Sequence, residues 1–124
     1  MEAFERRALL ETEPNPVAHR DYVVTLHGRV GATRLELRYV PDRDIVTRPA
    51  LARYLESMAG LDWRGIEHLG VTLTEDFFDV AIARWVEVVL CSEDEDGFRI
   101  EFMAEERQPA WNNPRLLDRI GKSG

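Results

Sequence analysis

The sequence is poor in metal-binding and redox-active residues: its 124 residues include one cysteine and three histidines. Cys91 alone cannot form an internal disulfide or a cysteine-rich zinc site. No apolar run approaches the roughly 20 residues that a membrane-spanning helix needs, and the first seven residues do not begin a secretory signal. Basic residues are outnumbered 16 to 23, and the net charge of −7 disfavours binding to nucleic acids or anionic membranes. These absences lead us to expect a cytoplasmic protein.

Hydrophobic residues make up 44% of the chain and charged residues 31%, a balance typical of a folded domain. The length fits a single domain, residues 1–124. Pro14 and Pro16 disfavour a helix before them, so the N-terminal part is expected to be extended. The sequence thus predicts an extended arm (1–20), a core (21–104) and a tail with one short helix (105–124).

Four segments have the residue types of β-strands, namely 22–26, 34–40, 84–91 and 98–103. The second of these alternates polar and apolar side chains, as a strand with one buried face does. Residues 27–33 contain two glycines and predict a turn between the first two strands. Asp96-Gly97 predicts a tight turn between the last two. The pattern therefore indicates two β-hairpins.

Two helices are expected between the hairpins. Residues 49–58 carry apolar side chains at helical spacing, with Thr47 as the N-cap. The segment 72–75, Thr-Leu-Thr-Glu, matches a capping box, which predicts that the second helix begins there and that residues 61–68 form a loop. Asp76 is then expected near the positive end of the helix dipole. This order of elements predicts an α+β fold in which two helices cover one face of a four-stranded antiparallel sheet.

The predicted sheet has two free edges and one face without helices. Such edges favour pairing with another chain, so we expect a homo-oligomer that assembles through strand edges. Binding sites are then expected where subunits meet.

Three stretches of the sequence carry a resemblance to a known family. They are Glu-Pro-Asn-Pro followed by Arg-Asp-Tyr-Val-Val (13–24), Leu-Arg-Tyr-Val-Pro-Asp (37–42) and Arg-Trp-Val-Glu-Val (84–88). In these stretches the chain resembles the 7-cyano-7-deazaguanine reductase family of the tunnelling-fold superfamily, whose members use NADPH to reduce a nitrile in queuosine biosynthesis. The resemblance covers residues 13 to 104 and implies a tunnelling fold of ββααββ order.

The resemblance also implies a substrate-binding residue. Counted back from Arg84 without a gap, Glu67 falls on the family's substrate-anchoring glutamate. A carboxylate can accept two parallel hydrogen bonds from the edge of a guanine-like ring, which presents a ring N–H beside an amino group. Ile66 stands where the family has a histidine, and His68, one place later, can fill that role only if the loop shifts.

The chain lacks the family's catalytic segment. In the family, the nucleophilic cysteine lies on the connection between the first two strands, which here shortens between Leu26 and Leu35 and holds neither that cysteine nor the proton-donating aspartate. Reduction of a nitrile through a covalent thioimide requires the thiolate. Residues 47–52 also depart from the family's cofactor motif, and the acidic turn 93–96 replaces an Arg-Gly-Gly segment. NADPH is therefore implied by the resemblance alone, and whether the chain is an enzyme stays open.

Other residues are candidates for a nucleophile, for zinc ligands or for stacking on a ligand. Cys91 is expected to be a packing thiol whose pKa the nearby carboxylates raise. The segment His27-Gly28-Arg29 is similar to the His-x-His zinc motif of pyruvoyl-tetrahydropterin synthases. A zinc site there would need His19 and His68 to converge with His27, so a solvated turn histidine is the simpler interpretation. The three tryptophans are expected to pack in the core or at an interface rather than stack on a ligand.

Three functional hypotheses follow. The first is a protein that binds a purine-like or pterin-like ring through Glu67 at a subunit interface. The second is a non-catalytic assembly subunit, the partner of a second tunnelling-fold chain. The third is a metal-dependent enzyme of the pterin type that uses the histidines.

Overall fold

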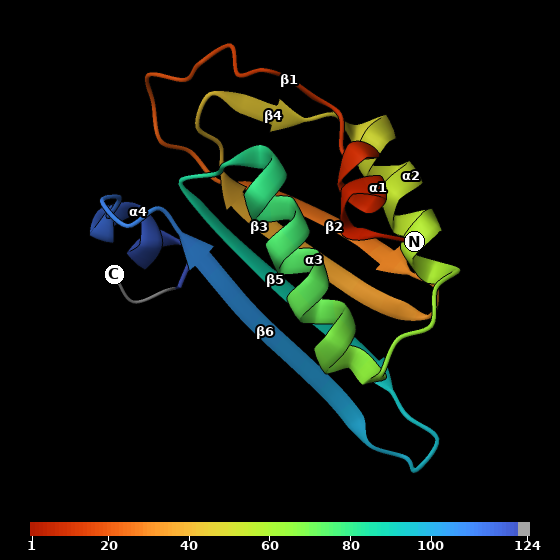
Figure 1. Cartoon of the computed structure of the whole chain (residues 1–124). Coiled ribbons are helices and arrows are strands. Elements are labelled where there is room, and N and C mark those ends of the chain that lie inside the picture. Colours follow the sequence, from red (N-terminus) through yellow and green to blue (C-terminus); the bar gives the residue numbers. More distant parts are fainter. Residues whose placement is uncertain (122–124) are drawn as a thin grey trace.

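The computed structural model of the protein describes residues 1–121 (Figure 1). Its main feature is a four-stranded antiparallel sheet in the order β2-β3-β5-β6, with helices packed on one face. The α+β fold is thus confirmed. The elements are α1 (Ala3–Ala8), β1 (Thr12–Pro14), β2 (Val24–Val30), β3 (Thr33–Val40), β4 (Asp44–Val46), α2 (Arg48–Ala59), α3 (Gly65–Ala81), β5 (Trp85–Glu93), β6 (Arg99–Arg107) and α4 (Pro114–Arg119). Between residues 1 and 121, no helix combines the length and apolar character needed to span a bilayer.

The first hairpin is tighter than the sequence predicts. Strand β2 continues through Val30, which pairs with Thr33, so only Gly31 and Ala32 form the turn. Gly31 has a φ of +58°, a conformation that glycine adopts without a steric penalty at the first position of a two-residue turn. The prediction that residues 27–33 form the turn is therefore wrong for residues 27–30 and for Thr33, because the strands pair on both sides up to Gly31-Ala32.

The core lies between the sheet and helices α2 and α3. Alternate residues of the strands, such as Leu35 and Leu37 on β3, point toward the helices and are almost fully buried. Helix α3 approaches β6 closely at Gly70, where a β-carbon would overlap the ring of Phe102. Helix α2 begins as predicted, with the Thr47 hydroxyl accepting a hydrogen bond from the Ala50 amide at 3.3 Å. These contacts fix the helix layer on one face of the sheet.

Helix α3 starts earlier than predicted. It begins at Gly65, so the second half of the segment expected to be a loop, including Glu67 and His68, belongs to its first turn. The Thr72 hydroxyl donates to the carbonyl of His68 at 2.8 Å and therefore lies in the helix interior rather than at a cap. The capping-box prediction is wrong because the same residue types can satisfy their hydroxyls along a continuing helix.

The short helix α4 forms where the tail was expected to be helical. The Asn113 side chain caps it by accepting a hydrogen bond from the Leu116 amide. Its Leu117 packs with Val40 and Trp85 on the face of the sheet opposite α2 and α3, in a small second hydrophobic cluster. The last part of the predicted tail, residues 122–124, lies outside the described residues.

The N-terminal segment is only partly extended. Residues 12–14 pair with β4, but Ala3–Ala8 form helix α1, so the expectation of an extended arm is wrong there. Helix α1 buries no residue and is held through its charged side chains instead. The Nε atoms of Arg6 and Arg7 each donate to a carboxylate oxygen of Asp76 at 2.8 Å, and the Tyr54 hydroxyl donates to the same carboxylate at 2.7 Å. A carboxylate on α3 therefore anchors α1.

Asp76 lies in the second half of α3 rather than near the positive end of the helix dipole, contrary to prediction, and it is fully buried. Burial by itself opposes its ionisation, but the hydrogen bonds from Arg6, Arg7 and Tyr54 outweigh that effect and lower the pKa of Asp76 below its ordinary 3.8. The same site raises the pKa of Tyr54, mainly through burial and also through the hydrogen bond to Asp76. Asp76 is therefore a buried, ionised carboxylate that accepts hydrogen bonds from Arg6, Arg7 and Tyr54.

Replacement of Asp76 by alanine is expected to destabilise the fold by about 3 to 5 kcal/mol, because it leaves two arginines and a tyrosine hydroxyl without their common acceptor. Urea unfolding monitored by circular dichroism measures this loss. Asp79→Ala is the matched control: Asp79 lies on the same helix, is 51% exposed and pairs only with Arg7, so about 1 kcal/mol or less is expected. Equal losses for the two variants would contradict the role given to Asp76.

The same network predicts a pH dependence. Because the folded pKa of Asp76 is lowered, its stabilising effect is present above the unfolded value near 3.8 and is lost as the pH falls through the folded pKa. The difference in unfolding free energy between the wild type and Asp76→Ala should therefore narrow in strong acid and be constant near neutrality. A difference that grows with acidity would refute this sign.

Candidate functional site

Glu67 lies in the first turn of α3 and its side chain is exposed. Its neighbour Ile66 is 8% exposed and belongs to the core, so the backbone at this position is held firmly while the carboxylate reaches solvent. Gly65, with a φ of +85°, starts the helix directly before them. The combination gives a carboxylate on a rigid helix end, available to a ligand or to another chain.

Two hollows flank this helix end. One, of about 340 Å³, is lined by Gly65 and Ile66 together with Trp63 and the β2–β3 turn. The other, of about 490 Å³, is lined by His68 with Trp63 and Arg6 of α1. Glu67 lines neither, so within one chain its carboxylate stands beside two concave surfaces without entering them.

His68 does not share a hollow with Glu67. Its Nδ1 accepts a hydrogen bond from the Arg64 amide at 3.2 Å, and its ring meets the Trp63 ring edge-on with centroids 4.9 Å apart. Because residue 68 belongs to the helix, the loop shift that would bring its side chain to the position of residue 66 would have to unwind a helical turn. The described side chain of His68 thus serves as a cap and packing partner.

The tryptophans divide between packing and hydrogen bonding. Trp85 is fully buried, and its Nε1 donates to Glu105 at 2.7 Å. Trp111 donates to Asp21 at 3.0 Å, and Trp63 donates to the carbonyl of Met58 at 2.8 Å. Only Trp63 lines the hollows near Glu67 and could cover the face of a bound ring.

The histidines lie on separate elements. Within residues 1–121, the structure brings together no group of three or more histidine, cysteine or acidic side chains that could hold a metal ion. His27 lies on β2, at an exposed position beside a hollow lined by Leu51 and Leu55 of α2. This arrangement does not support the hypothesis of a histidine-ligated zinc site.

The positions that correspond to the cofactor motifs do not fit a nucleotide phosphate. In the β5–β6 turn, the Asp94 carboxylate accepts hydrogen bonds from the amides of Asp96 and Phe98 at 3.0 and 2.9 Å. The amides that could bind a phosphate in this turn are thus taken by an acid of the chain itself. The other acids at the tip of the turn, Glu95 and Asp96, are exposed and would repel an anion there.

Cys91 has a different setting from the one expected. It lies half-exposed on β5, directly opposite Arg34 on β3, and the Arg34 guanidinium donates to its sulfur at 3.7 Å. Hydrogen bonds from Arg34 and then from Arg99 lower the pKa of the Cys91 thiol below its ordinary value. The expectation that carboxylates raise this pKa is therefore wrong, because cross-strand neighbours are closer to the sulfur than the acids that follow it in sequence.

The lowered thiol pKa predicts the behaviour of a variant. Arg34→Gln should raise the pH midpoint for alkylation of Cys91 by iodoacetamide, since it removes the largest cause of the shift. The rate of alkylation as a function of pH, followed by mass spectrometry, measures this. Arg115→Gln on α4, far from the thiol, is the control and should leave the midpoint unchanged. An unchanged midpoint in Arg34→Gln would show that the arginine does not tune the thiol.

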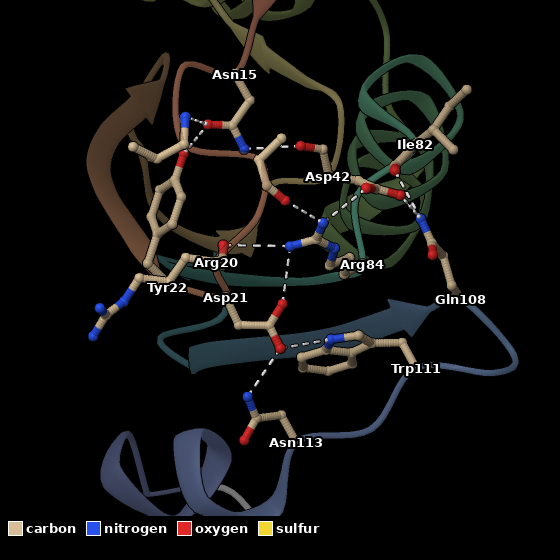
Figure 2. Close-up of polar contacts among 12 residues, drawn as sticks. Asn15, Arg20, Asp21, Tyr22, Asp42, Ile82, Arg84, Gln108, Trp111 and Asn113 are labelled. Atoms are coloured by element: carbon tan, nitrogen blue, oxygen red, sulfur yellow. Dashed lines mark hydrogen bonds and ion pairs between the residues drawn. The ribbon is translucent and has the colours of Figure 1, made fainter.

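The sequence stretches that carry the family resemblance meet at Arg84, which precedes β5 (Figure 2). Its guanidinium donates to Asp21 at 2.9 Å and to Asp42 at 3.1 Å, and it also donates to the carbonyls of Ala18 and Arg20. The Arg84 side chain is 18% exposed. It therefore connects the segment before β2, the connection after β3 and the start of β5.

Asn15 and Asp21 extend this network. The Asn15 side chain donates to the carbonyl of Asp42 at 2.8 Å and accepts from the Tyr22 hydroxyl at 2.7 Å. The second oxygen of Asp21 accepts from Trp111 and Asn113 in the C-terminal segment. The residues of the resemblance thus form a half-buried structural network, and Glu67, a site residue that the resemblance implies, lies outside it.

Comparison with known proteins gives two relatives. A protein of Syntrophus aciditrophicus named NADPH-dependent 7-cyano-7-deazaguanine reductase is 31% identical over 118 residues, covering 85% of this chain and 82% of that protein. A protein of Nitrosococcus oceani with the same name is 28% identical over 121 residues, covering 87% and 92%. No family model matches the chain.

Proposed function

Because the chain belongs to the family of NADPH-dependent 7-cyano-7-deazaguanine reductases, we propose that it binds a purine-like or pterin-like ring and does so through Glu67 at a subunit interface. The exposed carboxylate of Glu67 on the rigid first turn of α3 carries the proposal. Two parallel hydrogen bonds from a ring N–H and an adjacent amino group match the two oxygens of such a group.

The proposal places the ring between subunits because one chain leaves the site incomplete. Glu67 stands beside two hollows but lines neither, so a second surface is needed to cover a ring that it anchors. The sheet has two edge strands, β2 and β6, that each pair with a single neighbour in the chain. Unpaired strand edges favour assembly with further copies, which would supply that surface.

The proposal does not extend to nitrile reduction by the route of the family. The β2–β3 connection is a two-residue turn, Gly31-Ala32, which leaves no segment for a nucleophilic cysteine between these strands. The relatives are named as NADPH-dependent, but the β5–β6 turn here satisfies its own amides with Asp94. We therefore infer a ring-binding protein that has kept the framework of the family and lost that route.

Calorimetric titration with 7-cyano-7-deazaguanine and with guanine tests the ring site. Wild-type protein should bind at least one of them, and Glu67→Ala should weaken binding about a hundredfold because two charge-assisted hydrogen bonds are lost. Glu75→Ala, an exposed glutamate on the same helix, is the matched control and should bind as the wild type does.

Absence of binding to both ligands in the wild type would end the proposal. Equal affinity in the wild type and Glu67→Ala would remove Glu67 from the site. Circular dichroism of each variant separates these outcomes from a loss of folding.

The two-residue turn also favours a second candidate, a non-catalytic subunit that completes the site of another tunnelling-fold chain. A chain that keeps the framework and loses the catalytic connection can still contribute an interface. Native mass spectrometry separates the candidates: a homo-oligomer that binds the ring without a second chain supports the first. A monomer that assembles only after addition of a catalytically complete family member supports the second.

A further inference from the structure

Three arginines from three strands line one hollow at the end of the sheet near the β2–β3 turn. Arg29 comes from β2, Arg34 from β3 and Arg99 from β6, and the hollow has a volume of about 570 Å³. Arg34 lies next to the buried Leu35, so the alternation of the strand directs it away from the helices. Arg34 is therefore on the face opposite α3, and the hollow extends around the end of the sheet, where it shares Ala32, Thr33 and Ser92 with the 340 Å³ hollow beside Glu67. Its other lining residues are Ala32, Thr33, Cys91, Ser92 and Glu93.

The arrangement of charges in the hollow is unfavourable without an anion. Arg29 and Arg34 are directly opposite each other in the β2–β3 register, and like charges at such positions repel. Among the described residues, no ion pair or side-chain hydrogen bond involves Arg29. Arg34 has the sulfur of Cys91 as its acceptor, at 3.7 Å. Within residues 1–121, the charges at these two opposed positions thus have little compensation.

Acidic residues near the hollow neutralise it only in part. Arg99 pairs with Glu101 at 3.4 Å, and both side chains are about two-thirds exposed. Glu93 lines the hollow and lies opposite Arg99 in the β5–β6 register. The three arginines outnumber these two acids, so the hollow keeps a positive charge in a chain whose net charge is −7.

We propose that this hollow, the arginine hollow, binds the phosphate group of a small ligand. Guanidinium groups match phosphate oxygens with pairs of parallel hydrogen bonds, and three of them converging from separate strands can surround one such group. The hollow is larger than a phosphate ion, so it has room for part of a phosphate ester. The shared chemistry is a phosphate group, supplied either as inorganic phosphate or as a nucleoside monophosphate.

Titration of the full chain with inorganic phosphate and with guanosine monophosphate, at low and at raised chloride concentration, tests the arginine hollow. Saturable binding that weakens with added salt is expected. Arg34→Gln and Arg29→Gln should each weaken it roughly tenfold, the loss expected for a hydrogen bond to a charged group. Arg115→Gln, which removes an equal charge from an exposed position on α4, should leave the affinity within about twofold of the wild type if only screening is changed.

Two further variants separate the site from its surroundings. Cys91→Ser removes the thiol but keeps the three arginines, so phosphate binding should persist. Glu67→Ala should leave the binding of inorganic phosphate unchanged, so a failure of the ring site does not affect that result. In Glu67→Ala, which lacks the proposed anchor for the guanine ring, tighter binding of guanosine monophosphate than of phosphate would identify an ester as the ligand. Equal affinities in this variant would identify the free ion.

The proposal is overturned if neither probe binds saturably, or if Arg34→Gln, Arg29→Gln and Arg115→Gln have the same affinity. It is also overturned if Cys91→Ser abolishes binding to the extent that the arginine variants do. Because both arginines are exposed, their replacement should leave the unfolding midpoint unchanged, and circular dichroism checks this for each variant.

Discussion

The guanidinium of Arg84 is the interaction on which the arrangement of the chain depends. It binds two aspartates, Asp21 and Asp42, and two backbone carbonyls, all from segments distant in sequence. Through Asp21 the C-terminal segment is joined to the same point, because that carboxylate also accepts from Trp111 and Asn113. Removing Arg84 would leave several half-buried acceptors without a donor at once, which is a costly change for a small domain.

This network explains how the family framework persists while the chemistry changes. The residues that the chain shares with the reductase family hold strands and connections together. Their contacts in the Arg84 network do not include the β2–β3 turn. That turn could shorten to Gly31-Ala32 without disturbing the register of β3 with β5. The fold therefore tolerates loss of the catalytic segment. Glu67 is positioned independently of it, by the start of α3 and the buried Ile66 beside it.

Much of the fold could be predicted from the sequence because it is encoded locally. The alternation of residues 34–40 and the Asp96-Gly97 turn are properties of neighbouring residues, and both hairpins formed as expected in order and pairing. The start of α3 could not be predicted because the capping-box pattern is also compatible with a helix interior. Helix α1 was missed because its anchor, Asp76, lies about seventy residues away in sequence. No local sequence pattern predicts that contact.

The candidate sites also differ in how far the sequence predicts them, because some depend on contacts between strands. Glu67 was identified by a gap-free count from Arg84, and its role in anchoring a ring stays a prediction. The setting of Cys91 was misjudged because the groups that lower its pKa, Arg34 and Arg99, come from adjacent strands rather than from adjacent residues. The arginine hollow has the same origin. Cross-strand register, which brings Arg29 opposite Arg34, is visible only once the two-residue turn is known.

The central claim is that this chain keeps the framework of the reductase family without its thiolate route. The most direct test is the intact mass of the protein under denaturing conditions after incubation with 7-cyano-7-deazaguanine, because a covalent thioimide would persist as added mass. We predict the unmodified mass, even under conditions in which the native protein binds the ring. A stoichiometric mass increase equal to the ligand, localised to Cys91, would contradict the claim.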